Sequence, residues 1–195
     1  MADDTLRKPS GVARVFFQEI LEGDRRKLEA RSNDASTGGG ARDLRVPHKA
    51  FGPLFAKFFP TPKSVKRRRG GVSTTVEVQS GHVHWVERNV EYTHDVQYEP
   101  PTDARGSEGR IAKIHDISVL AERIPPASAG QVFLLLVQED NGKVFPHYVT
   151  LKGLKDTGFN REISRIIRLC ASNTRQGRSV RGYIDYVAGK SYCHG

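Results

Sequence analysis

Apolar residues recur along the chain at two spacings, one typical of helices and one typical of strands. Between Ser10 and Gly23 they are three to four positions apart, which predicts a short amphipathic helix over residues 12–21. The same spacing predicts two more helices, over residues 48–59 and 159–171. Pro60 and Pro62 are expected to end the first of these two helices.

Strand patterns occupy most of the remaining chain. Residues 72–96 alternate between apolar and polar positions, which predicts a β-meander with a turn at Ser80-Gly81. Shorter strands are predicted at 44–47 and 110–114, and the apolar run 131–138 leads through Asp140-Asn141-Gly142 into residues 144–151, the pattern of a β-hairpin. This order of elements predicts a β-rich α+β domain, with short helices flanking an open barrel.

Composition narrows the class of protein. The chain has 195 residues, enough for one domain, and its long apolar run is too short to cross a bilayer. The first residues show no export leader, and two cysteines give no disulfide framework, so we expect a cytoplasmic protein without membrane contact. The formal net charge of +9 favours a nucleic acid as the partner.

Two polar loops and one basic run carry the candidate binding chemistry. Both loops mix arginine with hydroxyl, amide and acidic side chains, which suits contact with base edges better than a purely cationic patch does. The basic run, residues 63–69, suits phosphate contacts, although a solvated turn would have the same composition. The candidate DNA-binding residues are Arg31, Asn33, Thr37, Arg42 and Arg45 of loop one, Lys66 and Arg68 of the run, and Arg105, Glu108, Arg110 and Lys113 of loop two.

The segment 27–40, followed by Leu44-Arg45-Val46-Pro47, resembles the start of the N-terminal DNA-recognition domain of the EcoRII-type restriction endonuclease family. The similarity continues in order through residues 55–60, 105–110, 134–142 and the helix around Ile163. The sequence differs from the family pattern at Gly40, Arg45 and Gly109, so the same recognition sequence is not expected.

The resemblance implies a B3-like open pseudobarrel over residues 12–173, between a flexible N-terminus (1–11) and a basic C-terminal tail (174–195). In that fold two arms enter the major groove of duplex DNA, and the domain regulates a catalytic nuclease domain or chain. The function implied is sequence-specific DNA binding in a bacterial restriction-modification or defence system, by a module that is not itself an enzyme and needs no cofactor or metal.

Two alternatives belong to other classes of function. A small metal-dependent nuclease would use Glu77, Asp95 and Glu99, although no lysine completes this set. An RNA-binding domain is less favoured, because the sequence shows no aromatic pair suited to stacking on bases. The His82-x-His84 pair is more typical of two outward residues of a strand than of a metal site. For the cysteines we expect Cys170 in the core and Cys193 in a frayed tail.

Overall fold

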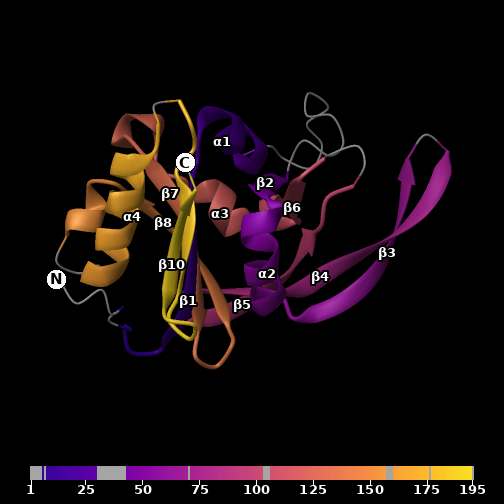
Figure 1. Ribbon diagram of the computed structural model, residues 1–195, viewed down its shortest axis with the longest axis horizontal. Coiled ribbons are helices and arrows are strands. Elements are labelled where there is room, and N and C mark those ends of the chain that lie inside the picture. The colour runs from indigo at the N-terminus through magenta and orange to yellow at the C-terminus, as the bar shows by residue number, and fades with distance from the viewer. Residues whose placement is uncertain are drawn as a thin grey trace. The chain divides into compact units, whose positions relative to one another are not determined.

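The computed structural model describes residues 6, 8–29, 43–69, 71–102, 106–156, 160–175 and 177–194. These residues form a β-rich α+β fold, as the sequence predicted (Figure 1). Contacts between residues divide the chain into two compact units: unit 1 is Met1–Arg25 with Arg123–Gly195, and unit 2 is Arg26–Glu122. No helix in the described part of the chain is long and apolar enough to span a bilayer.

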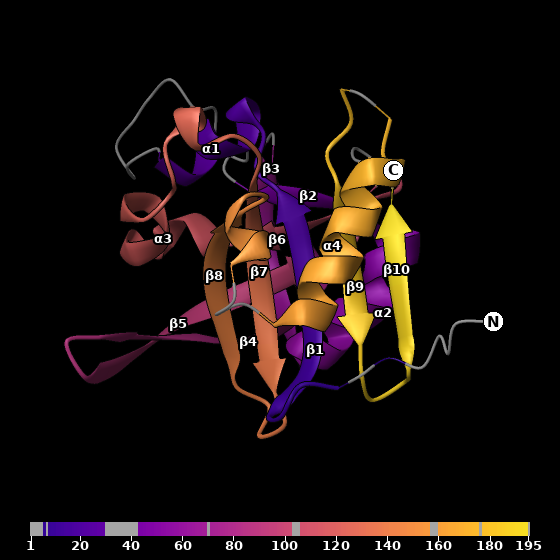
Figure 2. The same ribbon diagram turned by 90° about the vertical axis from the view of Figure 1, so that its left-hand side faces the viewer.

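Unit 1 is an antiparallel sheet covered on one face by a helix. Its strands follow the order β10-β9-β1-β7-β8. They are β1 (Val12–Glu19), β7 (Val132–Glu139), β8 (Val144–Thr150), β9 (Arg181–Asp185) and β10 (Lys190–His194). Figure 2 shows helix α4 (Arg161–Asn173) lying across this sheet, with the short 3-10 helix η3 (Gly153–Lys155) beside it.

Helix α4 confirms the predicted C-terminal helix. The Asn160 side chain caps it by accepting hydrogen bonds from the backbone N–H groups of Glu162 and Ile163. Its apolar positions recur with helical spacing and are buried against strands β1 and β7, in a core whose members include Val15, Phe17, Phe133, Leu135, Ile163, Ile166, Ile167 and Cys170. The turn of the β7–β8 hairpin is also where the sequence placed it, with Gly142 at a φ of 87°.

Two parts of unit 1 differ from the prediction. Residues 12–21 do not form a helix but contain β1, which pairs with both β7 and β9. A strand flanked on both edges and buried on both faces shows no alternation, so its apolar residues also fit helical spacing. The segment expected to be a basic tail contains strands β9 and β10, and Cys193 of β10 forms a disulfide with Cys170 of α4.

Unit 2 contains a further set of antiparallel strand pairings. Strand β4 pairs with β3 through its first half and with β5 through its second half, and β6 lies between β5 and β2. The strands are β2 (Leu44–Pro47), β3 (Thr61–Arg69), β4 (Val72–Glu87), β5 (Val90–Glu99) and β6 (Glu108–Ala112). The helices are α2 (His48–Phe58), the 3-10 turn η1 (Ile114–Asp116) and α3 (Ser118–Glu122), while α1 (Glu22–Glu29) contains the boundary between the units.

Strand β2 and helix α2 confirm the prediction, whereas the turn predicted at Ser80-Gly81 is wrong. Strand β4 runs straight through these residues, and the chain turns instead at Arg88 and Asn89, both with positive φ. The glycine serves a close approach: a Cβ at Gly81 would lie 2.9 Å from the ring of Phe59. Its presence therefore marks packing of the α2 end against the sheet, not a change of chain direction.

A second close approach links α2 to strands β5 and β6. The Tyr98 hydroxyl is 2.9 Å from His48 Nδ1, and a Cβ at Gly109 would overlap that hydroxyl. We expect Gly109→Ala to lower the free energy of unfolding by about 1–3 kcal/mol, because the added methyl group displaces the packed Tyr98 ring. Urea denaturation measures this, with Gly23→Ala as control, since a Cβ at Gly23 meets nothing within 4 Å. Equal stability of the two variants would contradict the prediction.

Candidate nucleic-acid interface

The structure describes only part of the predicted DNA-binding set. Arg31, Asn33, Thr37, Arg42 and Arg105 lie outside the described residues. Arg68 lies on β3, and its side chain is also outside the described part. The side chains that can be placed are those of Arg45, Lys66, Glu108, Arg110 and Lys113, all in unit 2.

Arg45 and Glu108 form an exposed pair across β2 and β6. Arg45 Nη1 donates to Glu108 Oε2 at 3.2 Å, and the two side chains are 54% and 43% exposed. An exposed ion pair of this kind contributes little to the free energy of unfolding. Each side chain can therefore leave its partner and contact a ligand at a small cost in free energy. Strand β2 follows loop one and β6 follows loop two, so this pair lies where both loops join the sheet.

Arg110 lies in a different environment from the one predicted. Its Nε donates to Glu99 at 2.7 Å and its Nη1 to Asp43 at 2.6 Å, and the side chain is only 20% exposed. Arg67 of β3 also donates to Glu99, whose side chain is 1% exposed. Burial raises the pKa of Asp43, against the opposing effect of the Arg110 guanidinium. The Arg110 side chain therefore belongs to an internal ionic cluster of unit 2, and we no longer expect it to contact DNA.

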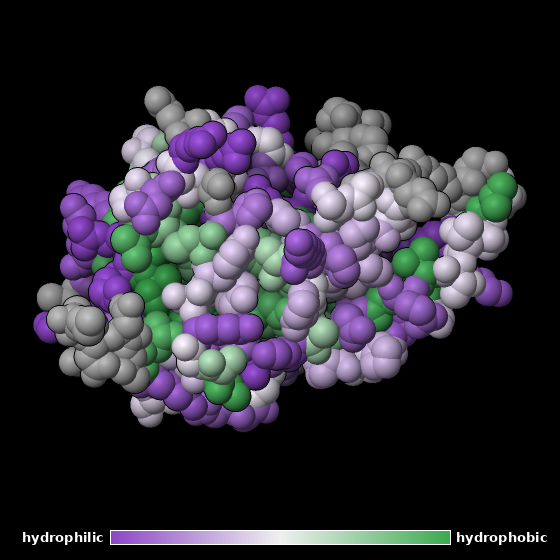
Figure 3. Space-filling model, in the orientation of Figure 1, coloured by the Kyte–Doolittle hydropathy of each residue, from purple (hydrophilic) through white to green (hydrophobic). Residues whose placement is uncertain are grey.

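The basic run forms one strand of a two-stranded ribbon, made of β3 and the first half of β4 (residues 61–80). Ser64 lies opposite Glu77 and Lys66 opposite Thr75, so these side chains share one face of the ribbon. Lys63 and Lys66 are exposed, as are the hydroxyl residues of the strand pair, Ser64, Ser73, Thr74 and Thr75. Figure 3 shows mostly hydrophilic side chains along this ribbon, interrupted by single hydrophobic ones. The ribbon is therefore a cationic, hydroxyl-bearing surface.

This ribbon was not predicted from the sequence. The composition of residues 63–69 fits phosphate contacts or a solvated turn, although Lys63, Val65 and Arg67 also alternate with Ser64, Lys66 and Arg68 as strand residues do. Lys113 lies just after β6, half-buried and with a φ of 67°. Lys113 immediately precedes the 3-10 turn η1 and is not part of the ribbon.

The residues of the alternative nuclease site are not brought together. Glu77 accepts a hydrogen bond from Ser64, Asp95 lies 2.9 Å from His82, and Glu99 is held by two arginines. Among the described residues, no group of three histidine, cysteine or acidic side chains is placed to hold a metal ion. Each carboxylate of the proposed set thus has a separate partner, and no observation favours metal-dependent cleavage.

The structure of unit 2 contains a stacked aromatic pair that was not predicted from the sequence. Trp85 of β4 and Tyr92 of β5 lie opposite each other and stack, with ring centroids 5.7 Å apart, and Tyr92 is 44% exposed. Residues that face each other across two strands are not adjacent in sequence. The pair could therefore be predicted only if the β4–β5 turn were placed correctly, at Arg88 and Asn89. Exposed stacked rings also occur in proteins that bind single strands, so single-stranded competitors belong in any binding test.

The candidate interface thus consists of the ribbon, with Lys63 and Lys66, and the exposed Arg45–Glu108 pair on β2 and β6. Both present charged side chains to solvent. When the chain is compared with protein-family models, with curated proteins and with solved structures, none of the three comparisons gives a match.

Proposed function

We propose that this protein binds double-stranded DNA in a sequence-specific manner through unit 2. The observation that carries the proposal is the exposed β3–β4 ribbon, which has Lys66, Ser64, Ser73 and Thr75 on one face and Lys63 and Thr74 on the other. The major groove of B-DNA is wide enough to admit a two-stranded β-ribbon. Lysine ammonium groups and hydroxyls are also the side chains that most often contact phosphate oxygens, and such contacts fix the position of a protein on the duplex.

Base recognition is assigned to the Arg45–Glu108 pair and to the loops that adjoin it. Arginine can donate two parallel hydrogen bonds to guanine O6 and N7, and glutamate can accept from cytosine N4. In the free protein the two side chains neutralise each other, at 3.2 Å. On a matching duplex each would exchange its partner for a base edge, whereas on a non-matching duplex the pair stays closed.

The finer proposal is a B3-like pseudobarrel that acts as the recognition module of a restriction-modification or defence system, with a nuclease domain or chain as partner. The resemblance of residues 27–47 to that family supports it, as does the β-rich α+β fold. The mixed chemistry of the two loops fits the arms by which such domains enter the major groove.

The test begins with selection of a preferred site from random duplexes, followed by titration of the selected and a scrambled duplex. We expect Glu108→Ala to weaken binding to the selected duplex by about 1–3 kcal/mol, because cytosine N4 loses its acceptor. Binding to the scrambled duplex should instead strengthen slightly, since the variant removes a negative charge. Glu122→Ala, which removes an exposed carboxylate from α3, is the control and should affect both duplexes equally.

Two results would overturn parts of the proposal. Stronger binding of Glu108→Ala to both duplexes would remove Glu108 from base recognition. Preference for single-stranded DNA or for RNA over the duplex, measured by competition in the same titration, would favour the Trp85–Tyr92 pair as the binding surface and reject duplex recognition.

A further inference from the structure

A second surface with unused charge lies in unit 1, between helix α4 and the 3-10 helix η3. A groove of about 1020 Å³ opens there, at the upper end of the range for small-molecule sites. Its apolar lining comes from Leu151, Leu154, Leu169 and Ala171, and Leu169 is 49% exposed.

Positively charged side chains outnumber negatively charged ones in the lining of this groove. Four cations line it, Lys155, Arg161, Arg165 and Arg168, with Asp156 as the one carboxylate of the lining. Arg165 is compensated, because it pairs with Glu162 at 2.9 Å. Lys155 and Arg168 are exposed, and in the described part of the chain neither has a carboxylate partner.

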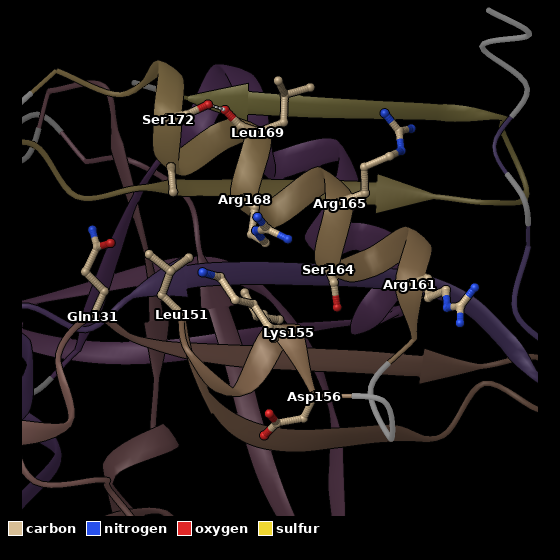
Figure 4. A pocket seen from close by; sticks show the side chains of 12 residues that line it. Gln131, Leu151, Lys155, Asp156, Arg161, Ser164, Arg165, Arg168, Leu169 and Ser172 are labelled. Atoms are coloured by element: carbon tan, nitrogen blue, oxygen red, sulfur yellow. Dashed lines mark hydrogen bonds between the residues drawn. The ribbon is translucent and has the colours of Figure 1, made fainter.

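Figure 4 shows how these groups are directed. Lys155 from η3 and Arg168 from α4 lie in the middle of the view, with Leu151 next to them, while Arg161 and Arg165 point outward. The Asp156 side chain points away from Arg168. Two like charges from separate elements therefore line one groove beside apolar side chains, an arrangement that suits an anionic ligand.

We propose that this groove binds a small amphipathic anion, a molecule with a phosphate group beside an aromatic or aliphatic part. The phosphate would lie between Lys155 and Arg168, since charge-assisted hydrogen bonds from two cations suit a doubly charged group. The apolar part would cover Leu151, which lies next to Lys155 in Figure 4. Every residue that lines the groove belongs to unit 1, so the site is distinct from the DNA surface proposed for unit 2.

The probe for the test is 1-anilinonaphthalene-8-sulfonate, whose fluorescence rises when its rings leave water and whose sulfonate stands in for the phosphate. We expect saturable binding at one site of the whole protein. Phenyl phosphate should displace the probe at concentrations about tenfold lower than either phenol or inorganic phosphate needs, because only phenyl phosphate has both parts.

Variants locate the site. Lys155→Met with Arg168→Met keeps the apolar stems, removes both charges, and should weaken probe binding at least about tenfold. Lys152→Met with Lys190→Met removes two exposed lysines of unit 1 that do not line the groove and should leave binding unchanged. Thermal unfolding of both double variants should match the parent, since the four side chains are exposed.

Three outcomes would overturn the proposal: no saturable probe binding, equal binding by the two double variants, or displacement of the probe by a DNA duplex. The last would assign the groove to nucleic acid. The first two outcomes concern probe binding alone and do not bear on duplex binding through unit 2, which is measured separately. Failure of the anion-binding proposal and failure of the DNA-binding proposal are therefore distinguishable.

Discussion

Replacing Glu99 by alanine should lower the free energy of unfolding by about 3–5 kcal/mol, the largest stability change we expect from a single substitution in unit 2. The Glu99 carboxylate is 1% exposed and accepts hydrogen bonds from both Arg67 and Arg110. Its removal leaves Arg110, which is 20% exposed, with Asp43 as its recorded acidic partner. Urea denaturation followed by circular dichroism measures the change.

The matched control is Glu108→Ala on the neighbouring strand. Glu108 also pairs with an arginine, Arg45, but both side chains are about half exposed, so the expected loss is at most about 1 kcal/mol. A loss of similar size in the two variants would show that burial does not distinguish these pairs. It would also return Arg110 to the set of side chains available to DNA.

Affinity for duplex DNA should fall by about 10³-fold between 50 and 200 mM salt, the second large effect. The estimate assumes about six phosphate contacts, each releasing counterions from the duplex. The cations proposed for these contacts are those of the loops and the ribbon, among them Arg31, Arg42, Lys63, Lys66 and Arg68. Fluorescence anisotropy at a series of salt concentrations gives the slope.

The ribbon's share of this effect is separable. Lys63→Gln with Lys66→Gln should lower the salt slope by about 2 and weaken all duplexes alike, because a phosphate contact is independent of sequence. Lys152→Gln with Lys190→Gln removes the same charge from unit 1 and should change the slope much less. If the two double variants change the slope equally, net charge rather than the ribbon accounts for DNA affinity.

Elements with strong local signals were predictable from the sequence. The hairpin at Asp140-Asn141-Gly142, helix α2 before its prolines, and α4 after its Asn160 cap are all encoded by residues within a few positions of each other. Strand β1 was not predictable, because it is buried between β7 and β9, and those partners lie more than a hundred residues away. Helix α1 was not predicted either, because Leu28 is its one buried residue and a single apolar position gives no helical spacing.

The candidate site was predictable in composition but not in arrangement. Arg45 and Arg110 look equivalent in the sequence, yet one is exposed and the other is held by Glu99 and Asp43. The acidic partners decide this difference, and Asp43 is 67 residues from Arg110 along the chain. The disulfide was missed in the same way: helix periodicity placed Cys170 in the core, but only the β9–β10 pairing brings Cys193 to it.

Unit 1 is discontinuous in sequence, and this has a consequence for biosynthesis. Phe16 of β1 pairs with Leu136 of β7, so all of unit 2 is synthesised between the two strands. At ribosomal rates, β1 remains without this partner for roughly 6–24 s, with its row of apolar residues exposed. All of unit 2 has been synthesised by Glu122, before β7 begins at Val132. The nascent chain therefore passes through a stage in which β1 is unpaired and aggregation-prone, a stage that favours chaperone binding to residues 12–19.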